Sequence, residues 1–206
     1  MKDLVVLVPD KNVQFGIDSL LSRYESLNIR QIFYEIFVHR LHDPGVYHNA
    51  ANFLRPLSNR YSYALVFLDH EGCGQERTPS DEIASTVKRN IERSGWPNRV
   101  EVIVFEPELE IWIWTDSPHT ASALGWNSFS DLKNWLTQQG LWAQNVAKPE
   151  RPKEAVEIAL RKRRIPRSSS IYREIAQNVS LIGCQDDSFM KFKNILLQWF
   201  PKEESG

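Results

Sequence analysis

A continuous apolar run at residues 64–68 constrains the fold of this chain more than any other feature. The run, ALVFL, has no polar residue at alternate positions, so it predicts a strand that is buried on both faces. Such strands are typical of mostly parallel sheets covered by helices on each side. The run ends abruptly at Asp69, and Glu71 follows in a glycine-containing loop. In open α/β sheets, ligands bind at this carboxyl end of the strands.

Asp69 and Glu71 stand two positions apart at the predicted strand end. Two acids this close repel each other unless a cation, a shared proton or water separates them. A hard divalent cation such as Mg²⁺ (or Mn²⁺) is a reasonable partner for such a pair. The alternative is a solvated strand end followed by a flexible turn, which needs no ligand.

The start of the chain repeats this pattern. Residues 4–8 form a second apolar run, rich in valine, that predicts a buried strand and ends at Pro9-Asp10. Apolar residues then recur at helical spacing over residues 13–26. Asp10 therefore becomes a third carboxylate at the end of a predicted buried strand.

The next segment predicts one more strand and one more helix. Residues 29–38 are apolar and β-branched enough for a strand, residues 43–45 (DPG) predict a turn, and residues 49–59 predict a helix. Three histidines lie in this region, and without a tight paired spacing they are more typical of surface or structural side chains than of metal ligands. They are His39, His42 and His48.

The strand at residues 100–105 ends in the acid-rich segment PELE, which contains Glu108 and Glu110. A helix is predicted before it, starting at Ser80, and another directly after it. Glu108 and Glu110 lie two apart, so on a helix one can face the site while the other caps or pairs. We interpret Trp112 and Trp114 as core or interface packing, with base stacking as the alternative.

A strand, an acid-rich exit and a helix thus occur three times in this order. The alternation predicts a mostly parallel α/β sheet flanked by helices, with three strand exits converging on one edge. Carboxylates that meet in this way favour a cation among them, because burying them unpaired is costly. Metal-assisted phosphoryl transfer is the chemistry that most often uses such a cluster.

These motifs also resemble those of a known protein family. The acid after the first strand, the Asp-x-acid pair, the Pro-Glu-x-Glu-x-Trp segment and the downstream Lys-Pro-x-x-Pro-Lys segment resemble Toprim-like proteins of bacterial defence loci, in the neighbourhood of RloB and OLD-type nucleases. The similarity spans residues 4–153 and extends to components of methylation-associated phage-defence systems. It implies a Toprim-like fold and a magnesium-dependent nuclease.

By this resemblance, Asp10 takes the acid/base position and Asp69 and Glu71 take the magnesium positions. The family usually has Glu at the first position and Asp-x-Asp at the pair. Asp10 is therefore shorter than the family's first acid, and Glu71 is longer than the second acid of its pair. The predicted catalytic residues are Asp10, Asp69, Glu71 and Glu108. The predicted ligands of Mg²⁺ (or Mn²⁺) are Asp10, Asp69, Glu71 and Glu110.

No strand-like run follows residue 115, which predicts a Toprim-like core at residues 1–115 and a helical extension packed on it at residues 116–206. Amphipathic patterns predict four helices in the extension. They begin at about residues 129, 155, 171 and 189.

A local basic block lies within this helical extension. Beside an acidic metal site it favours contact with a phosphate backbone, and the alternatives are a solvated helix face or a partner-docking surface. The predicted nucleic-acid-binding residues are Lys148, Lys153, Arg161, Arg163 and Arg164.

Composition narrows the function classes. The formal net charge of -1 excludes a globally basic nucleic-acid binder, and no P-loop or Rossmann fingerprint is present. No apolar run is long enough for a membrane span. Cys73 and Cys184 have the spacing of neither a disulfide framework nor a zinc site. A cytoplasmic location is therefore expected. Two functions stay open: a magnesium-dependent nuclease or related phosphoryl-transfer enzyme acting on DNA or RNA, and a non-catalytic subunit that binds nucleic acid or other defence-system proteins.

Overall fold

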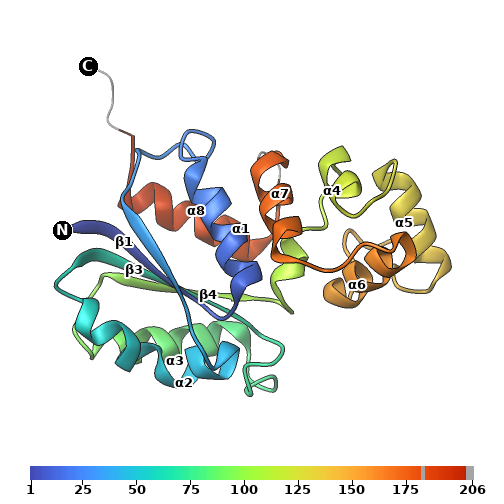
Figure 1. Ribbon diagram of the computed structural model, residues 1–206. Helices are drawn as coiled ribbons and strands as arrows, with labels where there is room; N and C mark the ends of the chain where they lie inside the picture. The colour runs from blue at the N-terminus through green and yellow to red at the C-terminus, as the bar shows by residue number, and fades with distance from the viewer. Residues whose placement is uncertain (182–183, 203–206) are drawn as a thin grey trace.

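A four-stranded, all-parallel sheet forms the centre of the molecule (Figure 1). The computed structural model describes residues 1–181 and 184–202. The strand order is β2-β1-β3-β4, and each neighbouring pair runs parallel. The α/β class predicted from the sequence is therefore confirmed. The strands are β1 (Lys2–Val8), β2 (Tyr34–Val38), β3 (Tyr61–Asp69) and β4 (Val100–Phe105).

The central position of β3 explains its unbroken apolar run. Its successive side chains point to opposite faces of the sheet and belong to two different core clusters, with Val66 in one and Leu65 and Phe67 in the other. Helices cover both faces of the sheet, so neither set of side chains meets water (Figure 1). Helices α2 (His42–Leu54) and α3 (Ser80–Glu92) cover one face, and α1 (Lys11–Ser22) and α8 (Asp187–Trp199) cover the other.

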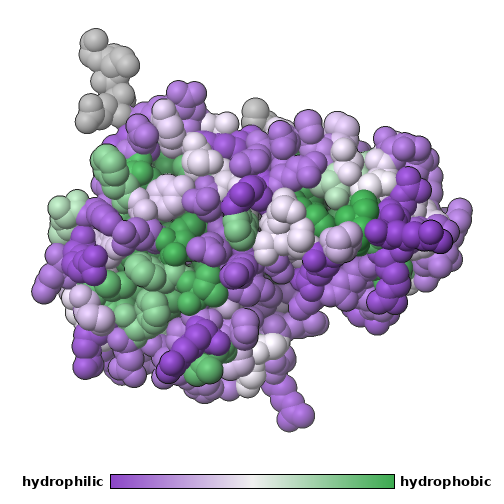
Figure 2. Space-filling model, in the orientation of Figure 1, coloured by the Kyte–Doolittle hydropathy of each residue, from purple (hydrophilic) through white to green (hydrophobic). Residues whose placement is uncertain are grey.

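β2 is one edge of the sheet, and all five of its residues are partly exposed. Apolar residues gather on the face of the molecule that this strand borders (Figure 2). Among the described helices, none combines the length and the apolar character that crossing a bilayer requires.

The rest of the chain after β4 is helical in its described residues. Helices α4, α5 and α6, which we call the helical lobe, lie beyond the carboxyl edge of the sheet, while α7 packs on α1 (Figure 1). Apolar residues from both sides of residue 115 share one core cluster, and the division at that residue stays a prediction. The elements are η1 (Arg55–Leu57), η2 (Leu109–Trp112), α4 (Pro118–Ala123), α5 (Phe129–Gln138), α6 (Pro152–Arg163) and α7 (Ser169–Asn178).

Several predicted boundaries differ from the structure. Residues 29–33 precede the strand, although Ile29 forms an antiparallel bridge with Pro201. The segment at residues 43–45, predicted as a turn, lies in the first turn of α2, where a proline is tolerated because its missing N–H would have no partner. Only glycine fits at position 45 without a shift of its neighbours, because the Cβ of any other residue would lie 2.2 Å from Nδ1 of His39.

The predicted helix after β4 is only the short 3₁₀ turn η2, and α4 was not predicted. Core packing of the two tryptophans is confirmed. Trp112 packs edge-on against Phe105, with ring centroids 4.8 Å apart. Trp114 is 3% exposed and its indole N–H donates to the carbonyl of Pro152.

Candidate functional site

Acidic residues follow all four strands at the carboxyl edge of the sheet. Because the strands are parallel and adjacent, Asp10 after β1 and Asp69 at the end of β3 lie at the same edge, as predicted. Asp43 comes from the start of α2, directly after β2, and was not predicted as a site residue. Glu108 and Glu110 follow β4.

Asp10 is held by the helix that it starts. It is the N-cap of α1, and its Oδ1 accepts a hydrogen bond from the backbone N–H of Val13 at 2.9 Å. This capping bond fixes the carboxylate at the positive end of the helix dipole. Asp10 is thereby oriented before any ligand binds.

Asp69 links three strand exits. Its Oδ1 accepts a hydrogen bond from the N–H of Leu109 at 2.9 Å, and its own N–H donates to Oδ1 of Asp43 at 2.7 Å. Asp69 is 9% exposed, so its carboxylate is almost completely withdrawn from water. The segments after β2, β3 and β4 are therefore joined through this one residue.

Burial and mutual repulsion dominate the electrostatics of these aspartates. Burial raises the pKa of Asp69 well above its usual range, and the charges of Asp43, Glu110 and Asp10 raise it further. Burial also raises the pKa of Asp43 to about 6, with a further contribution from Asp10. Within residues 1–181 and 184–202, no ion pair involves Asp10, Asp43 or Asp69. This aspartate cluster favours a proton or a cation.

Glu108 is different because a cation already accompanies it. Its Oε1 accepts a hydrogen bond from the backbone N–H of Lys153 at 3.0 Å, and its Oε2 lies 3.5 Å from Nζ of the same lysine. Burial raises the pKa of Glu108. Burial alone would lower the pKa of Lys153, but the charges of Glu108 and Glu110 raise it overall. Lys153 therefore stays protonated beside the site.

Glu110 belongs to a buried network with two partners. Its Oε1 accepts hydrogen bonds from Nη2 of Arg167, at 2.7 Å, and from the hydroxyl of Tyr172. Glu110 is 2% exposed, and Nη1 of Arg167 also pairs with Glu157 at 2.7 Å. Both glutamates of the PELE segment thus pair with cations, and their predicted catalytic and metal roles stay predictions.

Glu71 lies on the exposed side of the site. Its side chain is exposed, and its N–H donates to the carbonyl of Pro107 at 3.0 Å. The following loop is ordered by Glu76, whose Oε1 accepts hydrogen bonds from the N–H groups of Gly72 and Gly74, both at 3.0 Å. In the described part of the chain, no three His, Cys, Asp or Glu side chains are arranged as a preformed metal site.

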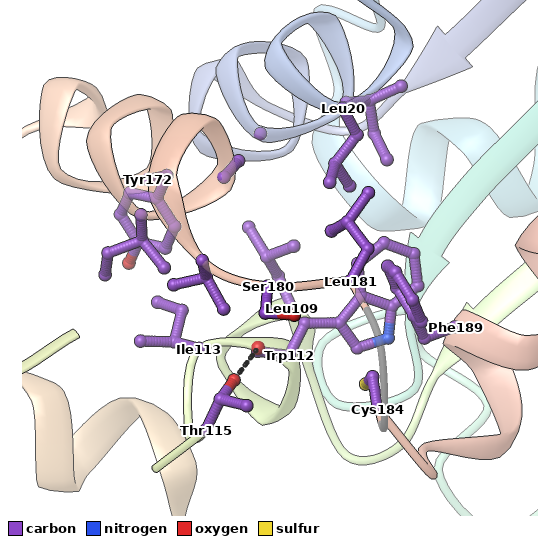
Figure 3. Close-up of a pocket in the computed structure, with 15 residues that line it drawn as sticks. Leu20, Leu109, Trp112, Ile113, Thr115, Tyr172, Ser180, Leu181, Cys184 and Phe189 are labelled. Carbon is purple, nitrogen blue, oxygen red and sulfur yellow. Dashed lines mark hydrogen bonds between the residues drawn. The ribbon is translucent and has the colours of Figure 1, made fainter. Parts of the chain in front are cut away.

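An apolar cavity of about 60 Å³ lies next to Tyr172, the residue whose hydroxyl donates to Glu110 (Figure 3). The ring of Tyr172 lines it, together with side chains of α1, η2 and α7 such as Leu20, Leu109 and Ile175. No charged side chain is among its lining residues, in contrast to the aspartate cluster.

The predicted basic block divides into residues with and without an acidic partner. Lys148 donates to the carbonyl of Ile111 and pairs with Asp186 at 3.1 Å, while Lys153 is held by Glu108. Arg161, Arg163 and Arg164 are exposed at the end of α6, where Nε of Arg163 donates to the carbonyl of Gly125 at 2.5 Å.

Comparison of the chain with protein-family models, with curated proteins and with solved structures finds no match. The Toprim-like resemblance therefore stays a prediction that depends on the motifs themselves. The sequence identified Asp10 and Asp69 from the strand exits. It missed Asp43, whose signal was the acid that directly follows a strand in the DPG segment.

Proposed function

We propose that this protein is a Toprim-like, metal-dependent nuclease of an anti-phage defence system. The observation that supports this proposal is the aspartate cluster: three carboxylates from three strand exits, with raised pKa values for Asp43 and Asp69 and no paired cation in the described residues. Hard carboxylate oxygens are the donors that Mg²⁺ and Mn²⁺ prefer. Mg²⁺ is usually held by one or two carboxylates together with water and substrate phosphates, so two of the aspartates suffice.

In this proposal Asp43 and Asp69 hold the ion, and Asp10 accepts a proton from the attacking water. A bound divalent ion would neutralise charge on the attacking and leaving oxygens of a phosphodiester. Lys153 places its ammonium beside the same carboxylates and contributes positive charge to the phosphate. Glu108 and Glu110 act as positioning residues, because they fix Lys153 and Arg167.

A second candidate function is a non-catalytic subunit that binds nucleic acid or another defence-system protein. The observation that favours it is that both glutamates after β4 are already paired with cations. In either case we propose a cytoplasmic location, consistent with two free cysteines.

A nuclease assay separates the two functions. Single- and double-stranded DNA and RNA are incubated with Mg²⁺ or Mn²⁺ and wild-type protein, Asp69→Ala or Asp10→Glu. Cleavage by the wild type that is lost in Asp69→Ala supports the nuclease. The opposite result is that wild type and Asp10→Glu stay inactive under every condition, alone and with proteins of the defence system. If wild type then binds DNA or a partner tightly, the binding function is correct.

A further inference from the structure

Several cations of the C-terminal region are paired with acids. The pairs are Lys148 with Asp186, Arg151 with Glu154, Lys153 with Glu108, and Arg167 with Glu110 and Glu157. The four consecutive cations at residues 161–164 are all exposed, and within the described residues none of them forms an ion pair. We call these four residues the α6 basic end.

Aromatic rings lie directly beneath the α6 basic end. The guanidinium of Arg163 is 5.3 Å from the ring centroid of Trp126, and Nζ of Lys162 is 5.8 Å from that of Trp135. The two indoles pack on each other with centroids 5.1 Å apart. Cations held above aromatic rings are fixed in place, and an exposed row of such cations can contact successive phosphates of a nucleic-acid strand.

Helix α6 connects this surface to the candidate active site. Lys153, in its first turn, contacts Glu108, and Arg163 is its last residue. At 1.5 Å per residue, these two positions are about 15 Å apart along the helix axis. The helical lobe that contains α6 lies beyond the carboxyl edge of the sheet (Figure 1), and its visible surface is largely hydrophilic (Figure 2).

We propose that the α6 basic end binds the phosphodiester backbone of the same strand whose reacting phosphate lies at the aspartate cluster. This inference rests on the proposed nuclease function and specifies its substrate class. A stacked strand advances about 3.4 Å per nucleotide, so the length of α6 from Lys153 to Arg163, about 15 Å, corresponds to four to five nucleotides. The substrate is therefore a polynucleotide that spans both sites, and not a mononucleotide or another small phosphoester.

Helix electrostatics offers a different reason for these cations. Positive side chains in the last turn of a helix stabilise its negative end whether or not a ligand binds. Helix α3 provides a matched control, because Arg89 lies in its last turn and Arg93 caps it, and both are exposed. Charge reversal at Arg89 and Arg93 destabilises the end of α3 for the same reason, but at a place far from the α6 basic end.

The test measures binding without cleavage. Fluorescence anisotropy in EDTA, over a series of salt concentrations, compares labelled strands of about 12 nucleotides with a labelled trinucleotide, which is too short to span both sites. DNA and RNA, single-stranded and duplex, are each measured. The proteins are wild type, Arg161→Glu/Arg164→Glu and Arg89→Glu/Arg93→Glu, with circular dichroism to show that all three are folded.

We expect at least one longer substrate to bind wild type more than tenfold better than the trinucleotide. Arg161→Glu/Arg164→Glu should bind it about tenfold more weakly, with a slope of log K against log salt smaller by about one to two, while the α3 variant is unchanged. Equal affinity of the two variants, or equal affinity for short and long strands, would overturn the inference. Binding that depends on length and on the α6 basic end, without cleavage in Mg²⁺ or Mn²⁺ either alone or with proteins of the defence system, would disprove the nuclease and keep the surface as a binding site.

Discussion

Two sets of acids at the same sheet edge have opposite surroundings. The aspartates at positions 10, 43 and 69 are bonded to backbone N–H groups, and in the described residues they have no cationic partner. Glu108 and Glu110 are as buried as Asp69, yet each is paired with a cation from the helical region. The difference is one of charge balance and not of burial.

The glutamates and the aspartates are therefore expected to have different roles. A buried carboxylate that is paired with a cation holds elements together, and removing one partner leaves the other charge uncompensated. Carboxylates that repel one another and are not themselves part of an ion pair favour binding a cation. The glutamates therefore fix Lys153 and the segment before α7, and the aspartates are the candidate ligands.

The largest expected effect is on catalysis. Asp69→Asn keeps the shape of the side chain but removes a ligand charge, so cleavage should fall by about 10³-fold, equivalent to several kcal/mol of lost stabilisation. Glu82→Gln, at an exposed position in the first turn of α3, is the control, and its cleavage rate should stay close to that of wild type. Initial cleavage rates in Mg²⁺ check this, and equal losses in the two variants would contradict a special role for Asp69.

The next effect is on stability. Glu110→Ala leaves Arg167 and Tyr172 without their buried acceptor, so the free energy of unfolding should fall by about 3 kcal/mol in urea denaturation. Glu157→Ala removes only the outer pair of the same arginine and should cost less than about 1 kcal/mol. If Glu110→Ala is as stable as wild type but loses Mg²⁺ affinity, Glu110 is a ligand and the contrast with the aspartates is wrong.

The aspartates should make the metal-free protein less stable as the pH rises. The pKa of Asp43 is raised from 3.8 to about 6 in the folded state, so between these values the folded protein binds more protons than the unfolded chain. The free energy of unfolding should therefore fall across this range, by on the order of 2 kcal/mol after allowance for the partial exposure of Asp43. Thermal unfolding of wild type and Asp43→Asn over this pH range checks it, and the variant should lack this part of the decline.

The smallest effect concerns the length of the first acid. In the proposed Toprim-like function, Asp10 stands where that family usually has Glu, which is one methylene longer, a difference on the order of 1 Å at the carboxylate. Asp10→Glu should raise the rate of cleavage several-fold. Asp10→Asn is the matched control and should lower it, and a lower rate in both variants would show that the native geometry requires Asp.

The sequence predicted the strands and the convergence of Asp10 and Asp69, because apolar runs without alternation identify buried parallel strands and parallel strands end at one edge. It predicted that one of Glu108 and Glu110 could pair, but not that both do, nor with which cations. Glu108 meets Lys153 from 45 residues away and Glu110 meets Arg167 from 57 residues away, which is set by tertiary packing and leaves no local pattern. Asp43 was missed because DPG favours a turn as strongly as a helix start.

Titration calorimetry with Mg²⁺ at neutral pH tests the central claim most directly. The claim is that the aspartates, and not the glutamates, hold the ion. Wild type should bind Mg²⁺, Asp43→Asn and Asp69→Asn should each bind it at least about tenfold more weakly, and Glu108→Gln should stay within about threefold of wild type. Unchanged affinity in both aspartate variants, or a loss confined to Glu108→Gln, would contradict the account.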